Sequence, residues 1–318
     1  MRSEAPEISV IAAVRDEAEN ILPLCDAIAA ALDGRRFETI FVDDGSEAAT
    51  VRALEEAVSR HDFVRVLFMG RRLGKGPALM AGCAAAASDL VVTIDADMQN
   101  DPADIPALLE ALREAHVVVG RRVRRADSVA RIVQSRLFNA ALRLACGCPL
   151  RDANCGLRAF RRRVLDNPAL FTDRHRIFPA LAHILGYTVR EIPVGHHPRR
   201  RHRSKYGPTR AFSAFSDVLL AALLRRFWRH PGLLFGLAGA VSFLLGVVVL
   251  LYLLYLRLSA GSIGWRYPLL ATGVVALLLG VQLVLSGFLA ESLLAGARRH
   301  PPSPVRALPV REDEEASP

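Results

Sequence analysis

Two carboxylates and an amide follow one hydrophobic segment of the chain. Asp95, Asp97 and Gln99 come directly after the apolar run 90–94, which is typical of a buried strand. If the backbone stays extended, residues at i, i+2 and i+4 project to the same side, so three oxygen-bearing groups converge. Such oxygens suit a hard divalent cation, Mg²⁺ or Mn²⁺, completed by water and substrate phosphate. The alternative is a helix N-terminus with a spare acid, because Asp101 before a proline resembles a helix start.

Two further polar clusters carry a less specific signal. Asp43 and Asp44 end another apolar run and precede a glycine and a serine. One of these carboxylates could bind a ribose or a base, but an ordinary Asp-Gly turn explains the residues nearly as well. Gly74, Lys75 and Gly76 resemble a phosphate-binding loop, yet the GxxxxGK-Ser/Thr pattern is not matched and no P-loop is predicted. Lys75 is then either a ligand of phosphate or a solvated side chain.

The residues around these clusters alternate between strand and helix patterns. Predicted strands cover 7–14, 37–42, 64–69, 90–94 and 117–119, and predicted helices cover 17–32, 48–60, 77–87 and 103–114. This alternation is typical of right-handed βαβ units and predicts an α/β fold with a mainly parallel sheet, covered on both faces. Ligands of such sheets bind beyond the carboxyl ends of the strands. The polar clusters, including four arginines after Gly120, all follow predicted strand ends and are expected to share one rim.

Two long apolar segments lie near the C-terminus. Residues 231–256 and 267–290 contain no charged side chain, and each is long enough to cross a hydrocarbon core of about 30 Å as a helix. Arginines before the first segment and after the second predict, by the positive-inside rule, that both ends are cytosolic and joined by a short external loop. The first residues include an acid, Glu4, and no apolar run, so no secretory signal is predicted.

Charge and cysteine usage restrict the partners. The chain of 318 residues carries a formal net charge of +9, and with two spans present this favours phospholipid and phosphorylated ligands over nucleic acid. The five cysteines lack a zinc-binding spacing, and a cytosolic setting predicts free thiols. The predicted parts are a cytosolic α/β domain at 1–208, an amphipathic interfacial helix at 209–230, two membrane helices within 231–297 and a disordered tail at 298–318.

Six motifs become informative as an ordered set. They are VDDGS, GKGPALMAG, DADMQ, VVVG with its arginines, DANCGLRAFR and EIPVGHHPRRRHRSKYG. Together they resemble the family 2 glycosyltransferases of the dolichol-phosphate mannose synthase and polyprenyl-phosphate glycosyltransferase type, over residues 8–210. The resemblance implies a GT-A (Rossmann-like) fold and inverting transfer of a sugar from a UDP- or GDP-linked donor to a polyprenyl phosphate. The two spans match the bacterial branch anchored in the inner membrane, whose members can form homo-oligomers.

The resemblance also implies roles for individual residues. Asp95, Asp97 and Gln99 would hold Mg²⁺ or Mn²⁺ and the donor diphosphate, with Asp97 counted as catalytic. The donor would further contact Arg15, Glu17, Val42, Asp44, Lys75 and Ala96, and the phosphates of donor and acceptor would be neutralised by Arg122, Arg136, Arg199 and Lys205. The family's usual proline and tyrosine before Glu17 are here Ala13 and Arg15, which leaves the choice of nucleotide open.

A phosphate acceptor needs no general base. A phosphate monoester has a second pKa of roughly 6, so its oxygen is already anionic near neutral pH. The demanding parts are departure of the nucleoside diphosphate and repulsion between phosphates, which a divalent cation and arginines relieve. Asp152 is the residue that could still act as a base or a positioning group. Its alternative role is to order its own loop through Arg151 or Arg158.

Two other functions are compatible with the sequence. A hydroxyl acceptor on a lipid or glycan would require a base, so a severe loss of rate in Asp152→Asn with intact donor binding would favour it. A non-catalytic membrane scaffold that binds nucleotide sugars would have no use for an intact set of metal ligands. The basic stretch 199–211 could bind nucleic acid, but its position shortly before a span favours phosphates at the bilayer surface.

Overall fold

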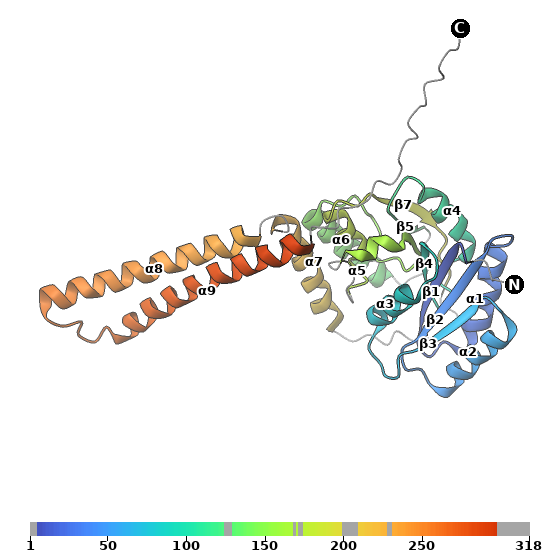
Figure 1. Cartoon of the computed structure of the whole chain (residues 1–318), viewed down its shortest axis with the longest axis horizontal. Helices are drawn as coiled ribbons and strands as arrows, with labels where there is room; N and C mark the ends of the chain where they lie inside the picture. The colour runs from blue at the N-terminus through green and yellow to red at the C-terminus, as the bar shows by residue number, and fades with distance from the viewer. Residues whose placement is uncertain are drawn as a thin grey trace, which may run out of the picture. The chain divides into compact units, whose positions relative to one another are not determined.

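The computed structural model describes residues 5–123, 129–167, 170, 174–198, 209–227 and 231–297. Contacts divide the chain into two compact units, with the boundary between Ala222 and Leu223. The first unit holds an α/β fold, and the second holds two long helices (Figure 1). Arg199 and Lys205, which were predicted to bind phosphate, and the predicted tail at 298–318 lie outside the described residues.

One seven-stranded sheet forms the centre of the first unit (Figure 1). Its strands are β1 (Ile8–Val14), β2 (Phe37–Asp43), β3 (Val64–Phe68), β4 (Leu90–Asp95), β5 (Val117–Arg122), β6 (Arg158–Arg161) and β7 (Val189–Val194). The strand order is β3-β2-β1-β4-β6-β5-β7. Only β6 runs antiparallel to its neighbours, so the carboxyl ends of the other strands meet at one edge. The predicted mainly parallel sheet is confirmed, with β6 inserted between β4 and β5 and β7 added at the edge.

Helices connect these strands and cover the sheet. They are α1 (Ala18–Ala31), α2 (Ala48–Arg60), α3 (Lys75–Ala85), α4 (Ile105–Ala111), α5 (Val129–Cys146) and α6 (Phe178–Ile184), with 3₁₀ turns at Pro102–Asp104 and Arg162–Asp166. Nearly all residues of β1, β2 and β4 are buried, as expected for strands covered on both faces. The five cysteines are free and buried in this core, which confirms the prediction of free thiols.

Helix α7 (Thr209–Phe227) corresponds to the predicted interfacial helix. One of its faces packs on the α/β unit, because Nη1 of Arg174 donates a hydrogen bond of 2.9 Å to the buried carboxylate of Asp217. Phe215 and Leu219, four residues apart, are exposed and form an apolar stripe. The helix is therefore both packed and amphipathic, and its contact with a lipid surface stays a prediction.

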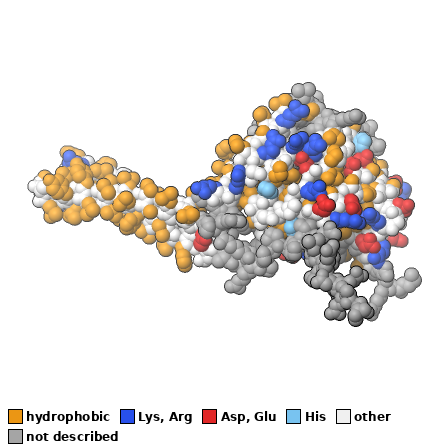
Figure 2. Space-filling view, turned by 90° about the horizontal axis from the view of Figure 1, so that it is seen from above, with side chains coloured by type: hydrophobic (Ala, Val, Ile, Leu, Met, Phe, Trp, Pro, Cys, Tyr) orange, Lys and Arg blue, Asp and Glu red, His pale blue; other side chains and the backbone are white. Residues whose placement is uncertain are grey.

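The second unit is a hairpin of α8 (Pro231–Ala260) and α9 (Tyr267–Ala297). Both helices run past the predicted ends of the spans, and each contains an apolar stretch long enough to cross a membrane. In the most apolar window of each helix only 17% of the residues are buried, which is unlike a helix of a soluble core. Hydrophobic side chains cover the visible face of the hairpin (Figure 2). These features fit a membrane protein.

The two helices of the hairpin meet through paired glycines. Three lie seven residues apart on α8 and three lie seven residues apart on α9: Gly232, Gly239, Gly246, Gly273, Gly280 and Gly287. A Cβ on Gly239 would lie 2.8 Å from the carbonyl oxygen of Gly280, and a Cβ on Gly246 would lie 2.8 Å from that of Gly273. Bare backbones thus contact one another along the seam, which is the packing that small residues allow between membrane helices.

This seam leads to a stability prediction with a matched control. Gly239→Leu should separate the helices and lower the melting temperature of the detergent-solubilised chain, since overpacking a tight contact costs about 1–3 kcal/mol. Gly236→Leu, one turn away, should leave that temperature nearly unchanged because a Cβ at Gly236 meets no atom within 4 Å. The measurement is the loss of helical circular dichroism on heating. Equal effects of the two substitutions would contradict the paired seam.

Candidate active site

The polar clusters that follow predicted strands do lie at one edge of the sheet. In the parallel register, Asp43 of β2 pairs with Val14 of β1, and Asp95 of β4 pairs with Ala13 of β1. The ends of these three strands are therefore level. Arg122 ends β5, which runs in the same direction farther along the sheet. The predicted common rim of acids, glycines and arginines is thus confirmed for the described residues.

Asp95 is held as an ionised carboxylate at this rim. Nζ of Lys75, the first residue of α3, lies 2.5 Å from Oδ1 of Asp95. Burial by itself would raise the pKa of the Asp95 carboxyl, but the ammonium of Lys75 and two nearby guanidinium groups outweigh burial and lower the pKa. Asp95 therefore carries its negative charge throughout the neutral pH range.

A backbone segment lies directly against this carboxylate. A Cβ on Gly156 would lie 2.1 Å from Oδ1 and 2.5 Å from Oδ2 of Asp95, so only glycine leaves room for the carboxylate. The hydroxyl of Thr93 donates a hydrogen bond of 3.0 Å to the Gly156 carbonyl, which ties the segment to β4. The position of Asp95 is consequently set from one side by Lys75 and from the other by Gly156.

The extended backbone expected across the acid cluster is wrong. β4 ends at Asp95, and the chain then turns, with Met98 in the left-handed region at φ 58°. Within the turn, the backbone N–H of Gln99 donates a hydrogen bond of 3.2 Å to Oδ1 of Asp97. Asp95, Asp97 and Gln99 therefore do not lie on one side of an extended strand, as the sequence had led us to expect. Their shared role as metal ligands stays a prediction that rests on their closeness in the chain.

The acids at the rim fit a cation that takes few ligands from the protein. Among the residues that the structure describes, no group of three or more His, Cys, Asp or Glu side chains could hold a metal ion. Asp95 and Asp97 would provide two carboxylates, and the ion pair with Lys75 shows that Asp95 accepts a cationic partner. Mg²⁺ and Mn²⁺ are commonly held by one or two carboxylates together with water and substrate phosphate. The two carboxylates of Asp95 and Asp97 therefore fit an ion of this kind.

The carboxylate of Asp44 orders the glycine-rich loop. Its Oδ1 accepts hydrogen bonds from the backbone N–H groups of Leu73 at 2.6 Å and Gly74 at 2.9 Å, and its side chain is buried. The loop that presents Lys75 at the start of α3 is thereby fixed to the end of β2. A contact between Asp44 and a nucleoside stays a prediction, in addition to this structural role.

The remaining residues predicted near the donor differ in exposure. Val42 and Ala96 are buried, and the Val42 side chain lies beneath Gly82 of α3, so a donor contact at these two residues stays a prediction. Arg15 and Glu17 follow β1 and are partly exposed. These two residues have side chains that a donor at the rim could contact.

An arginine-lined cavity of about 720 Å³ opens beside α5 and the end of β5. Its wall is made of Arg121, Arg122, Ile132, Val133, Arg136, Leu137, Asn139, Ala140, Arg143, Arg151 and Asp152. Among the described residues, no carboxylate pairs with the side chains of Arg136, Arg143 or Arg151. Cationic and apolar groups on one wall suit a ligand with an anionic head and an apolar tail. The predicted phosphate contacts at Arg122 and Arg136 share this cavity.

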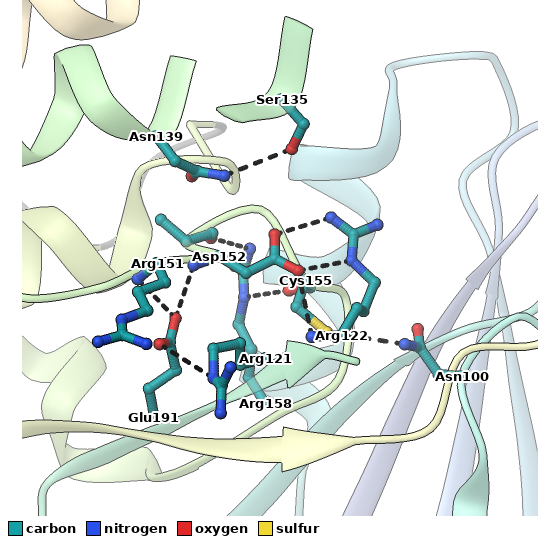
Figure 3. Close-up of polar contacts among 11 residues, drawn as sticks. Asn100, Arg121, Arg122, Ser135, Asn139, Arg151, Asp152, Cys155, Arg158 and Glu191 are labelled. Atoms are coloured by element: carbon teal, nitrogen blue, oxygen red, sulfur yellow. Dashed lines mark hydrogen bonds and ion pairs between the residues drawn. The ribbon is translucent and has the colours of Figure 1, made fainter. Parts of the chain in front are cut away.

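Asp152 forms a bidentate ion pair with Arg122 (Figure 3). Nε of Arg122 lies 2.7 Å from Oδ2, and Nη2 lies 2.8 Å from Oδ1. The side chains of Asp152 and Arg122 are only 6% and 15% exposed. This geometry favours a role for Asp152 in ordering the loop over a role as a base, and its partner is Arg122 instead of the expected Arg151 or Arg158.

Arg158 has a different task beneath the same loop. Its guanidinium donates hydrogen bonds to the backbone carbonyls of Cys155 at 2.8 Å and Ala153 at 3.1 Å. Burial lowers the pKa of this guanidinium, and the carboxylates of the site partly compensate. The Arg158 side chain therefore supports the loop 152–156 by binding the loop's backbone carbonyls, and it contributes positive charge near Asp95.

The ion pair predicts a coupled loss of stability. Asp152→Ala removes the carboxylate that binds both Nε and Nη2 of Arg122, and breaking a buried pair in this way costs about 3–5 kcal/mol. The double substitution Asp152→Ala with Arg122→Ala should be less harmful than the sum of the two single substitutions. Thermal melts of the solubilised chain measure the coupling. Additive effects would show that the pair does not order the loop.

Gly156 and Glu191 were not identified from the sequence, and Arg158 was considered there only as a partner of Asp152. Gly156 and Arg158 lie in the motif DANCGLRAFR, and Glu191 opens EIPVGHH, so the motifs contain them. Gly156 and Glu191 act through contacts with residues far away in the chain, such as the one between Gly156 and Asp95, whereas Arg158 binds the nearby carbonyls of Cys155 and Ala153. A glycine and an arginine within a motif full of polar residues were the available signal.

Comparison with known proteins is consistent with this geometry. The family model described as "Glycosyl transferase family 2" matches residues 9–167. A dodecaprenyl-phosphate galacturonate synthase of Rhizobium johnstonii is 34% identical over 307 residues, covering 94% of this chain and 90% of that protein. An undecaprenyl-phosphate 4-deoxy-4-formamido-L-arabinose transferase of Proteus mirabilis is 33% identical over 291 residues, covering 90% and 87% of the two chains.

Solved structures share the fold of the first unit. Glucosyl-3-phosphoglycerate synthase from Mycobacterium tuberculosis, in complex with Mn²⁺, UDP and glucosyl-3-phosphoglycerate, is 25% identical with a TM-score of 0.53. The match covers 69% of this chain and 80% of that chain. The expected GT-A-like arrangement of a mainly parallel sheet is thereby confirmed.

Proposed function

The chain is a family 2 glycosyltransferase, and from that premise we propose that it transfers a sugar from a nucleotide donor to a polyprenyl phosphate at a membrane surface. Its relatives named for dodecaprenyl and undecaprenyl phosphate support this choice of acceptor, since they match nearly the whole chain. The two apolar helices of the second unit support a location at a bilayer.

One observation carries the proposal: a single loop touches both the acidic rim and the arginine-lined cavity. At one end of the loop Gly156 lies against Asp95, and at the other Asp152 pairs with Arg122. A donor diphosphate at the rim and an acceptor phosphate in the cavity would therefore lie on either side of the same short segment. Transfer between two phosphorylated substrates requires that the donor and acceptor sites be adjacent, because reacting atoms must approach to about 3–3.5 Å.

The arginines would do the main electrostatic work on the acceptor. Arg122 and Arg136 would bind the polyprenyl phosphate, reduce its repulsion from the donor and aim one of its oxygens at the anomeric carbon. That oxygen is anionic near neutral pH, so no proton has to be removed before attack. Attack from the side opposite the leaving diphosphate inverts the anomeric centre. A hydroxyl acceptor is disfavoured because both carboxylate oxygens of Asp152 already bind Arg122.

The donor side would depend on the acids of the rim. Asp95 and Asp97, with Gln99 as a further ligand, would hold Mg²⁺ or Mn²⁺, and such an ion neutralises the charge of a leaving diphosphate. Lys75 pairs with Asp95, so its ammonium would be close to that diphosphate and add to the neutralisation. Arg15 and Glu17 would contact the nucleoside. Binding of Mn²⁺ and UDP by the mycobacterial synthase makes UDP-sugars the first donors to test.

The proposed topology places the site on the cytosolic side. Arg225 and Arg226 at the end of α7 precede the hairpin, and the arginines beyond α9 follow it, so both flanks carry positive charge. The exposed stripe of α7 would rest on the lipid headgroups, at the level where the phosphate of a polyprenyl acceptor lies.

A direct assay tests the function. Washed membranes that contain the chain are incubated with polyprenyl phosphate, Mg²⁺ or Mn²⁺ and a panel of labelled UDP- and GDP-sugars, and the lipid product is identified by mass spectrometry. We expect one donor to give a polyprenyl-phosphate sugar, and we expect chelation of the cation to abolish the product. Donor binding without any lipid-linked or glycan-linked product would overturn the proposal in favour of a scaffold, and a glycan product would indicate a hydroxyl acceptor.

A further inference from the structure

Glu191 on β7 binds the backbone of the loop that carries Asp152. Its Oε1 accepts hydrogen bonds from two consecutive N–H groups, that of Arg151 at 2.8 Å and that of Asp152 at 2.6 Å (Figure 3). Its Oε2 lies 3.8 Å from Nε of Arg121, and its side chain is 12% exposed. One carboxylate thus joins β7, the end of β5 and the residue that orients Arg122.

The two ends of this loop have different anchors, apart from Arg158, which binds carbonyls toward both ends, at Cys155 and Ala153. At the Gly156 end, the hydroxyl of Thr93 and the guanidinium of Arg158 hold the backbone. At the Asp152 end, Glu191 accepts from the backbone N–H groups of Arg151 and Asp152, Arg122 binds the Asp152 carboxylate, and Arg158 binds the carbonyl of Ala153. Arg122 is itself the group that the loop orients, so Glu191 is the side chain from outside this pair that holds the N–H groups of residues 151 and 152.

We propose that Glu191 is a positioning residue that sets the arginine-lined cavity for the acceptor phosphate and leaves the donor site unaffected. Because Asp152 fixes Arg122 through two hydrogen bonds, a loop that shifts at residues 151–152 also shifts the guanidinium aimed at the acceptor. The Gly156 end keeps its own anchors, so Asp95 and the donor side stay in place. This inference rests on the proposed function for the identity of the acceptor, whereas the anchoring itself does not depend on it.

Glu191→Gln and Glu191→Ala differ in whether a hydrogen-bond acceptor remains for the two N–H groups. A glutamine keeps one oxygen that can accept from both N–H groups, whereas an alanine leaves the two N–H groups without this acceptor. Glu191→Ala should therefore lower kcat/KM for polyprenyl phosphate by about tenfold or more, with KM for the donor within about twofold, since small misplacements of positioning groups lower rates strongly. Glu191→Gln should recover most of the acceptor kcat/KM.

A matched control comes from the neighbouring residue of the same strand. Arg190 forms an exposed ion pair with Glu114, so Glu114→Ala removes a carboxylate partner of β7 without touching the loop. This variant should keep wild-type kinetics for both substrates. A loss of acceptor kcat/KM as large as in Glu191→Ala would show that any disturbance of β7 is sufficient, and would overturn the assignment.

A second measurement reads the anchor without any turnover. Hydrogen exchange of the full chain, followed by mass spectrometry, should become faster at the amides of Arg151 and Asp152 in Glu191→Ala, and stay slow in Glu191→Gln and Glu114→Ala. Unchanged exchange in Glu191→Ala, or a loss of kcat/KM that falls equally on donor and acceptor, would refute the role. If the wild-type chain shows no transfer to polyprenyl phosphate while exchange responds as expected, the proposed function fails and the anchor remains.

Discussion

Replacing Asp97 with alanine is expected to abolish sugar transfer while the chain still folds and inserts into membranes. Asp97 follows Asp95 at the end of β4 and would share the cation that neutralises the leaving diphosphate. Removing a group that stabilises developing charge commonly lowers turnover by about 10³-fold. The turn that contains Asp97 is short and partly exposed, so the effect on the melting temperature should be small.

The matching control is an acid at the opposite end of the same strand. Asp89 precedes β4 and lies 3.6 Å from Arg161, half exposed to solvent and far along the strand from the rim. Asp89→Ala should therefore transfer sugar at the wild-type rate. Turnover is measured with saturating donor in washed membranes, at several concentrations of Mn²⁺. Wild-type turnover of Asp97→Ala would refute its assigned role, and recovery at high Mn²⁺ would indicate weaker binding of the cation.

Gly156→Ala is expected to be nearly as damaging, although it adds only a methyl group. That methyl would stand 2.1 Å from Oδ1 of Asp95, so the carboxylate has to rotate away from Lys75 or the loop has to move. Either change displaces a predicted ligand of the cation. A loss of turnover of about 100-fold corresponds to about 2.7 kcal/mol of lost transition-state stabilisation.

The control for this substitution is a glycine with ordinary space around it. A Cβ on Gly195, which follows β7, would lie 3.6 Å from its nearest neighbours, so Gly195→Ala should be close to wild type. Turnover and donor binding are compared for the two variants, together with their melting temperatures. Normal donor binding and turnover in Gly156→Ala would contradict the prediction, because it would show that sugar transfer does not depend on the position of Asp95 against the loop.

The strands β1 to β4 and the helices α1 to α3 that connect them could be predicted from the sequence, because each has a clear pattern of apolar and polar residues. β1, β2 and β4 are apolar runs buried on both faces, β3 is a shorter and more exposed apolar run, and Gly, Asp or Pro residues mark the turns between the strands. β7 (Val189–Val194) has no such pattern, since it mixes charged residues with a proline and is only partly buried. β6 has four residues, too few for any periodicity to be seen.

The site could be predicted at the level of residue types but not of contacts. A strand end with two acids indicates charge chemistry at the rim; in the structure Asp95 forms an ion pair with Lys75 there, and its role toward a metal stays a prediction. The pairing of Asp152 with Arg122 joins residues thirty positions apart, whereas the sequence alone suggested Arg151 or Arg158 as the partner. The left-handed turn at Met98 was also invisible, because a methionine rarely adopts a positive φ and gives no warning of it.

The glycine pairs between α8 and α9 have a consequence for the path of a lipid substrate. Because main-chain atoms of the two helices touch at regular intervals along the seam, no isoprenoid tail has room to slide between them. A long-chain acceptor would have to travel over the outer flanks of the hairpin, among ordinary acyl chains. Entry of the substrate should then depend on the fluidity of the surrounding bilayer more than on any opening within the hairpin.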